Sequence, residues 1–194
     1  TKFCKKMNVL RILLTITILS LLSQSCNHAI DNSPSVMNEY IDSIITSNTR
    51  ITHSGKSETF WEDEYVYGNR RKQWIYTDSI EKYCNTDELL ELYNNHESPI
   101  IRMVAFHLLL KNSPKEAVRI AIKDIDQTDS LLGGRCDQAL EESASSIRIR
   151  MIQQWPKKYD ISVEDSLYVD SAVVNSPNKE SLWYFRSKFE SKIR

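Results

Sequence analysis

The sequence predicts an all-α fold, and three observations predict it. The 194-residue chain has only 4 Gly and 5 Pro, which is few for the tight turns of a β-sandwich or barrel. Apolar residues recur at intervals of three and four through most of the chain, as they do along one face of a helix. Residues 85–112 contain two such patterns separated by a Ser-Pro pair. We therefore expect one domain of six or seven helices over residues 35–194.

The N-terminal segment, residues 1–25, is predicted to be an export signal and no part of this domain. Positive charge from Lys5, Lys6 and Arg11 precedes an uncharged run of eleven residues, 12–22. A helix that crosses a bilayer needs about 20 apolar residues, so this run is too short to span one. A charged start followed by a short apolar core is typical of a secretory signal.

Residues 21–26, with the sequence LLSQSC, resemble the lipobox of bacterial lipoproteins. The resemblance implies lipid on Cys26 and a polar tether over 26–34. Asn27, and not Asp, follows the cysteine, which implies transfer to the outer membrane of a Gram-negative bacterium, facing the periplasm. Several acyl chains, at about 0.8 kcal/mol per buried CH₂, would hold the protein at the membrane. A cleaved signal with an incidental cysteine and an uncleaved anchor are the alternatives.

The charge balance argues against a nucleic-acid partner. The chain has 25 basic and 26 acidic residues, and four of the basic residues lie in the predicted signal: Lys2, Lys5, Lys6 and Arg11. The remainder therefore carries 21 basic residues (25 less 4) against 26 acidic ones, a net charge of −5. Nucleic acids and anionic lipids attract basic surfaces. The lipid alone is expected to provide the membrane attachment.

The first part of the domain is predicted to contain two helices. Residues 35–48 and 69–84 have helical spacing of apolar residues, and residues 49–56 between them are loop-like. Alternation through Tyr65 and Tyr67 allows a short strand, although the sequence offers no evident partner strand.

The stretch 85–112 is predicted to be an antiparallel helical hairpin. Thr86 is placed to cap its first helix, with acidic residues in the first turn, where the helix dipole favours them. Ser98 and Pro99 then provide an N-cap and a first-turn proline for the second helix. The same device at Ser113-Pro114 predicts the start of the next helix.

The rest of the chain is predicted to continue as helices. Residues 126–136 form a loop with the only double glycine, and residues 139–155 form a helix stopped by Pro156. Two more amphipathic patterns cover 163–174 and 178–193.

An internal repeat relates residues 98–102 to residues 144–148. Both segments end in Ile-Arg, so Arg102 and Arg148 correspond at an offset of 46 residues. A period of this length with two helices in each unit resembles HEAT repeats, with units at about 86–112 and 117–155. The resemblance implies a helical-repeat solenoid, and in this class the arginine at position 102 braces neighbouring turns.

No sequence motif predicts catalysis, a metal ion or a cofactor. The chain contains no HExxH, GxSxG, P-loop or dinucleotide-binding pattern. His96 and Glu97 lie in an interhelical turn, whereas His107 lies nearly three helical turns further on, so the three are not expected to converge on a metal. We predict that the protein is not an enzyme.

Cys84 and Cys136, the two cysteines beyond the lipobox, could form a disulfide in an oxidising periplasm. The alternative is that both are small buried core residues.

The segment 60–76 is dense in aromatic residues, which are candidates for a ligand or partner surface: Trp61, Tyr65, Tyr67, Trp74 and Tyr76. Trp and Tyr offer rigid, amphipathic contact area to a sugar or a peptide. Packing in the core is the alternative for the same residues.

Every Asp-Ser pair in the chain is followed by an aliphatic residue. This pattern is similar to the acceptor sequence of a periplasmic O-glycosylation system, and it implies glycan on one or more of Ser43, Ser130 and Ser166. The alternative is that polar pairs precede apolar residues at helix edges for structural reasons.

These observations predict a non-catalytic, lipid-anchored periplasmic protein that binds a protein or peptide partner or serves in assembly. Helical solenoids usually bind through concave surfaces. The alternative is a glycan-binding module that uses the aromatic segment 60–76.

Overall fold

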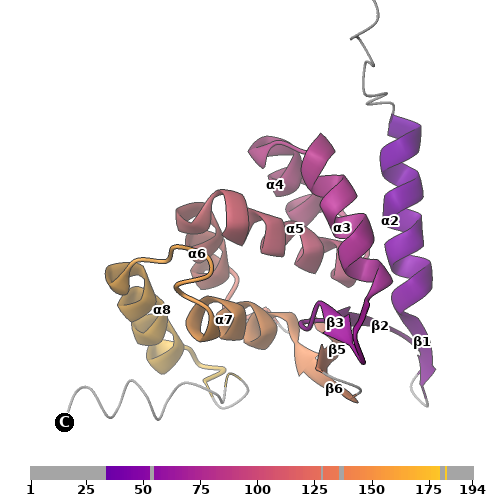
Figure 1. Ribbon diagram of the computed structural model, residues 1–194. Coiled ribbons are helices and arrows are strands. Elements are labelled where there is room, and N and C mark those ends of the chain that lie inside the picture. The colour runs from indigo at the N-terminus through magenta and orange to yellow at the C-terminus, as the bar shows by residue number, and fades with distance from the viewer. Residues whose placement is uncertain (1–33, 53–54, 128, 136–137, 180–181, 183–194) are drawn as a thin grey trace, which may run out of the picture. The chain divides into compact units, whose positions relative to one another are not determined.

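The computed structural model describes residues 34–52, 55–127, 129–135, 138–179 and 182 (Figure 1). The chain divides into two units, Thr1–Val36 and Met37–Arg194. All contacts described below lie within the second unit. Several predictions fall outside the described residues and stay predictions: the signal 1–25, the tether, lipid on Cys26, and all but the start of the helix at 178–193.

The described residues form seven helices and six strands. The helices are α2 (Pro34–Asn48), α3 (Lys72–Tyr83), α4 (Thr86–Asn95), α5 (Pro99–Asn112), α6 (Pro114–Lys123), α7 (Ala144–Gln154) and α8 (Val163–Asn175). The strands are β1 (Thr49–Thr52), β2 (Gly55–Trp61), β3 (Tyr65–Val66), β4 (Asn69–Arg70), β5 (Ser130–Arg135) and β6 (Gln138–Ser143).

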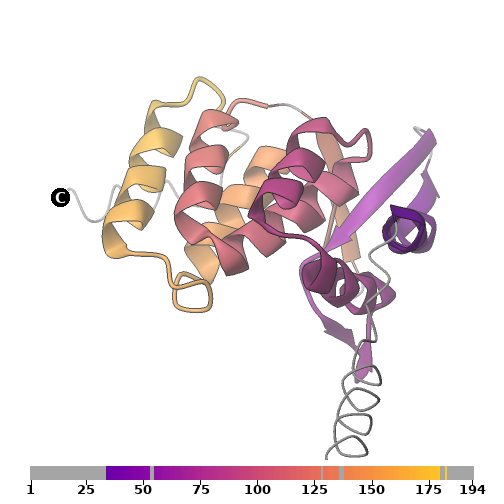
Figure 2. The same cartoon turned by 90° about the horizontal axis from the view of Figure 1, so that it is seen from above.

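Helix α5 lies at the centre of the packing. It contacts α4, α6 and α7 as well as strands β2 and β5, and ten of its residues are buried. Figure 2 shows α5 between α4 and α6, with α8 on the far side of α6. A helix that is apolar on nearly all sides is typically buried in the core. The sequence pattern predicted only one buried face for α5, whereas the structure buries nearly all of its sides. Among the described residues, no helix is both long and apolar enough to cross a membrane.

The expectation of an all-α, HEAT-like helical solenoid is wrong, because a four-stranded mixed sheet packs against the helices. Its strand order is β1-β2-β5-β6. Strand β2 runs antiparallel to β1 and parallel to β5, and β5 and β6 form an antiparallel pair. A separate two-stranded sheet pairs β3 with β4.

The sheet occupies segments that the sequence assigned to loops or to a helix. The predicted loop 126–136 contains β5, and the first five residues of the predicted helix 139–155 belong to β6. The double glycine lies inside β5 because bulky neighbours approach the backbone there. A Cβ on Gly134 would lie 2.3 Å from Cε3 of Trp61. Tertiary pairing thus overrides the local signals.

The predicted helical hairpin is present, with one correction at its first cap. Asn85, and not Thr86, caps α4: its side chain accepts hydrogen bonds from the backbone N–H groups of Asp87 and Glu88 at 2.9 and 3.0 Å. The Thr86 hydroxyl instead lies 3.2 Å from that of Ser113. The predicted cap and first-turn proline of α5 at Ser98 and Pro99 are confirmed.

The cap of α5 also ties this helix to the sheet. Ser98 Oγ donates a hydrogen bond to Glu58 Oε2 at 2.6 Å, and the backbone N–H of Ile100 donates to the same oxygen at 3.0 Å. A carboxylate at a helix N-terminus interacts favourably with the helix dipole. Strand β2 is therefore fixed at the start of the central helix.

Candidate functional site

The five aromatic residues of the predicted surface divide into three environments. Trp74 lies in the core, 6% exposed, with its ring centroid 4.5 Å from that of His107. Tyr76 is partly buried, and its ring centroid lies 6.3 Å from that of Tyr40 in α2. Trp61 is also buried, whereas Tyr65 and Tyr67 are exposed, so the five residues do not share one surface.

Tyr65 and Tyr67 lie on the exposed β3-β4 hairpin, at 57% and 85% exposure. Tyr67 and Gly68 join the two strands and have φ angles of 48° and 79°. Two consecutive residues with positive φ are typical of a type I′ hairpin turn. The partner strand that the sequence did not reveal is β4, which is only two residues long.

Trp61 lines a surface groove of about 260 Å³ between the end of α2, strand β2 and the start of α3. We call it the Trp61 groove. Its lining residues are Ser47, Asn48, Arg50, Trp61, Val66, Arg71, Lys72 and Gln73.

The position of Trp61 is fixed on two sides. The backbone N–H of Trp61 donates to Gln73 Oε1 at 2.9 Å, and Gln73 Nε2 donates to the backbone carbonyl of Trp61 at 3.2 Å. The pairing of β2 with β1 extends only as far as Glu58, opposite Thr49, the first residue of β1. At Trp61 the side-chain amide of Gln73 therefore takes the place of a neighbouring strand. The indole packs against the backbone of Gly134 in β5. Trp61 is only 5% exposed as a result.

Two guanidinium groups lie over the indole of Trp61. The Cζ atom of Arg71 lies 3.7 Å from the ring centroid, and that of Arg50 lies 5.0 Å from a ring centroid of the same side chain. Such cation–π contacts are worth about 0.5–2 kcal/mol and hold the planar guanidinium in a fixed orientation.

The Trp61 groove carries a positive charge. Arg50, Arg71 and Lys72 all line it, and no carboxylate is among its lining residues. Arg50 and Lys72 are exposed to solvent. Planar, oriented guanidinium groups suit bidentate contact with carboxylates or phosphates. The groove is therefore chemically suited to bind an anionic group.

A buried ion cluster supports the strand that carries Trp61. Glu62 directly follows the last residue of β2. Its carboxylate accepts hydrogen bonds from Arg150 in α7 and from Arg135 at the end of β5. Arg150 also donates to Glu142 of β6. Buried charges need such partners because desolvation penalises an unpaired one. The cluster links the sheet to α7.

The histidines of the sequence analysis do not come together. His107 is buried, and its Nδ1 lies 3.2 Å from the hydroxyl of Tyr159. His96 follows α4, and its Nδ1 accepts a hydrogen bond from the backbone N–H of Ser98 at 3.0 Å. Within the described part of the chain, no three His, Cys, Asp or Glu side chains are grouped to hold a metal ion.

Two further predictions remain untested. Cys84 follows α3 and is partly buried, but Cys136 lies outside the described residues, so their disulfide stays a prediction. Ser43 in α2 and Ser166 in α8 are partly buried, whereas Ser130 at the start of β5 is exposed and donates a hydrogen bond to Glu141. O-glycosylation of these serines also stays a prediction.

Sequence reasoning missed Arg50, Arg71 and Gln73 as residues of the groove. Three of the four residues in 49–52 are β-branched, which was the available signal that Arg50 lies in a strand. Nothing in the sequence signals that Gln73 bonds to Trp61, because that contact depends on how α3 packs beside β2.

Comparison of the chain with protein-family models, with curated proteins and with solved structures found no match. The functional inference therefore depends on the residues of this chain alone.

Proposed function

We propose that the protein is a non-catalytic binding module whose Trp61 groove holds an acidic segment of a protein partner. One observation carries this proposal: three cationic side chains and no carboxylate line a groove in which two guanidinium groups are oriented by an indole ring. Complementary charge gives such contacts specificity and fast association.

The size of the groove favours part of a partner over a whole small molecule. Sites that enclose small ligands usually measure about 300–1,000 Å³. At about 260 Å³, the Trp61 groove has room for one or two side chains of a segment that continues across the surface. Carboxylate side chains of such a segment would meet Arg50 and Lys72.

Two titratable groups, Cys84 and His107, are poor candidates for a catalytic role. Burial raises the pKa of the Cys84 thiol to about 11, so little thiolate is present at neutral pH. Burial also lowers the pKa of His107 to about 3, so its imidazole does not exchange protons near neutral pH. Neither group is suited to nucleophilic or acid–base chemistry.

We also propose that lipid on Cys26 holds the module at the outer membrane, facing the periplasm. The lipobox-like residues 21–26 support this location. Cys26→Ser should move the protein from the membrane fraction to the soluble fraction of the native host. Retention of this variant in membranes would contradict lipid anchoring without affecting the proposed role of the groove.

Fluorescence anisotropy with two labelled peptides tests the binding function. One peptide carries alternating Asp and Glu, and the other has Gln in place of each carboxylate. The acidic peptide alone should bind, and Arg50→Gln combined with Lys72→Gln should weaken it at least about fivefold.

The matched control for this experiment is Lys115→Gln combined with Lys157→Gln. Both lysines are exposed and neither lines the Trp61 groove, so the control removes the same charge from elsewhere. Equal weakening by both double variants, or equal binding of both peptides, would refute the proposal.

Glycan binding is the second candidate, and exposed Tyr65 and Tyr67 are the observation that favours it. Trp61 and Trp74 are too buried to offer ring faces for sugar stacking. Glycan-array binding that is lost in Tyr65→Ala combined with Tyr67→Ala, but kept in Arg50→Gln combined with Lys72→Gln, would favour this alternative.

A further inference from the structure

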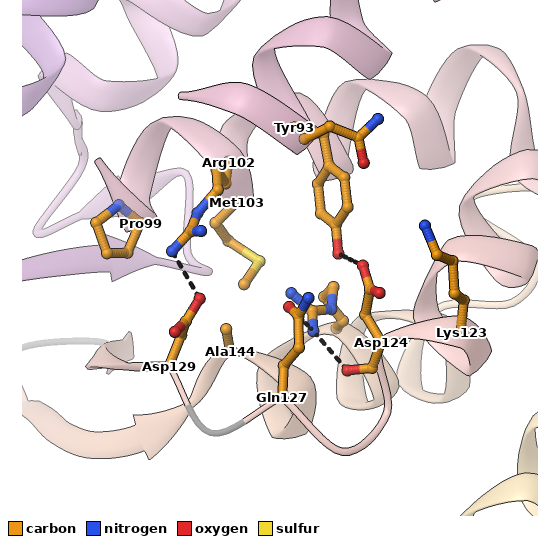
Figure 3. A pocket seen from close by; sticks show the side chains of 11 residues that line it. Tyr93, Pro99, Arg102, Met103, Lys123, Asp124, Gln127, Asp129 and Ala144 are labelled. Carbon is orange, nitrogen blue, oxygen red and sulfur yellow. Dashed lines mark hydrogen bonds and ion pairs between the residues drawn. The ribbon is translucent and has the colours of Figure 1, made fainter. Parts of the chain in front are cut away.

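A second, smaller pocket lies where four helices meet, away from the Trp61 groove (Figure 3). Its volume is about 100 Å³. Helices α4 and α6 end at the pocket, whereas α5 and α7 begin there, and residues 127 and 129 of the α6–β5 loop close one side. We call it the Arg148 pocket.

Arg148 is the most deeply buried charged group of this pocket, with 3% of the residue exposed. Its Nη2 donates hydrogen bonds to the backbone carbonyl of Asp124 at 3.0 Å, to Gln127 Oε1 at 3.3 Å and to Ser145 Oγ at 3.4 Å. All three acceptors are neutral. Its Nε–H has no hydrogen-bond partner among the described residues. Burial disfavours the charged guanidinium and lowers the pKa of Arg148.

The carboxylates that line the pocket are engaged with other groups. Asp124 Oδ2 accepts a hydrogen bond from the hydroxyl of Tyr93 at 2.7 Å. Asp129 Oδ2 pairs with Arg102 Nη2, also at 2.7 Å. Figure 3 shows these two contacts on opposite sides of the pocket, with Arg102 and Tyr93 reaching it from α5 and α4.

The lining therefore has a surplus of positive charge. Three cations, Arg102, Lys123 and Arg148, face two carboxylates, Asp124 and Asp129. The helix dipoles add no clear net charge at the pocket, because the positive ends of two helices and the negative ends of two others meet there. Burial lowers the pKa of Arg148 and outweighs Asp124 and Asp129, which favour its charged form through space. A buried cation that no carboxylate pairs with directly is costly, and a further anion would offset that cost.

We propose that the Arg148 pocket binds one small anionic group, a carboxylate or a phosphate, that supplies the missing counter-charge of Arg148. A water molecule occupies about 30 Å³ in the liquid, so about 100 Å³ holds about three waters, whose place one carboxylate or phosphate group can take. Lys123, which is exposed at the rim, provides a second positive charge for the same group.

The ¹⁵N–¹H signal of the Arg148 side-chain Nε–H reports binding directly. The full ¹⁵N-labelled chain in a non-ionic detergent is titrated with acetate and, separately, with phosphate, with chloride replaced so that ionic strength stays fixed. Arg150 is the internal reference because its Nε–H already donates to Glu62. We expect a saturable shift of the Arg148 signal and none of the Arg150 signal.

The two probes distinguish the source of the anion. Tighter binding of acetate indicates a carboxylate ligand, and tighter binding of phosphate indicates a phosphorylated one. Lys123→Gln should raise the dissociation constant at least about threefold, whereas Lys115→Gln, on the exposed side of α6, should leave it unchanged. Absence of a saturable shift with both probes, or parallel shifts of Arg148 and Arg150, would overturn the proposal.

Discussion

The side-chain amide of Gln73 accepts a hydrogen bond from the backbone N–H of Trp61 and donates one to its backbone carbonyl, as a neighbouring strand would. Both residues are buried, so neither of the two backbone groups can exchange this partner for bulk water. The contact fixes α3 beside the end of β2 and thereby fixes one wall of the Trp61 groove.

Replacement of Gln73 by leucine should destabilise the fold strongly. An unsatisfied buried polar group costs about 1–3 kcal/mol, and Gln73→Leu leaves the N–H and C=O of Trp61 without this partner. We expect the free energy of unfolding to fall by about 2–4 kcal/mol in urea denaturation. Gln138→Leu, at an exposed position of β6, is the control and should change it by less than about 0.5 kcal/mol. Equal effects of the two changes would contradict this role.

Gly134→Ala should destabilise the protein more than Gly133→Ala. A Cβ on Gly134 would lie within 2.7 Å of three atoms of the Trp61 ring, which the rest of the structure holds in place. A Cβ on Gly133 would meet the ends of two long side chains at 3.0–3.3 Å, and these can shift. We expect a loss of about 2–3 kcal/mol for Gly134→Ala and under about 1 kcal/mol for Gly133→Ala.

A double-mutant cycle identifies the cause of the Gly134→Ala effect. If the clash with Trp61 is responsible, Gly134→Ala should cost much less when it is made in a Trp61→Leu background. Additive effects of the two substitutions would show that the clash is not the cause.

His107 should make stability depend on pH below about 6.5. Burial lowers its pKa from the ordinary value of 6.5 to about 3, so between these values the unfolded chain binds the proton more readily than the folded protein. The contribution of neutral His107 to the free energy of unfolding is therefore complete above pH 6.5. It falls by up to about 1.4 kcal/mol per pH unit as pH drops from 6.5 toward 3.

Urea denaturation at pH 7.5 and pH 5.0 measures this dependence. His107→Phe keeps an aromatic ring between Trp74 and Tyr159 but removes the titrating group. The wild-type protein should lose about 2 kcal/mol more than His107→Phe between the two pH values. Equal losses in the two proteins would mean that His107 is protonated in the folded state near its ordinary pKa.

The helices between residues 86 and 123 could be predicted because their signals are local. The Ser-Pro pairs at 98–99 and 113–114 mark the starts of α5 and α6 within one residue. The strands could not be predicted in the same way. Thr59 pairs with Leu132 across 73 residues, and neither segment alternates clearly. Residues 139–143 favour helix locally but pair with β5.

The candidate site was predicted only in part, for a related reason. Aromatic density in 60–76 included Trp61, which lines the groove, but it could not separate this residue from Trp74, which packs in the core. The charge of the groove comes from two separate places, Arg50 in β1 and the consecutive residues Arg71 and Lys72 at the start of α3. Their convergence depends on the reversal of the chain between β1 and β2.

Site-specific photo-crosslinking in the native host tests the central proposal most directly. A photo-reactive amino acid replaces Lys72 in the Trp61 groove or, as the control, Lys115 on α6. We expect one protein to be crosslinked at position 72 and not at position 115, through a peptide rich in Asp and Glu. The same adducts at both positions, or an adduct at position 72 without acidic residues, would contradict the proposal that this groove binds an acidic segment of a protein partner.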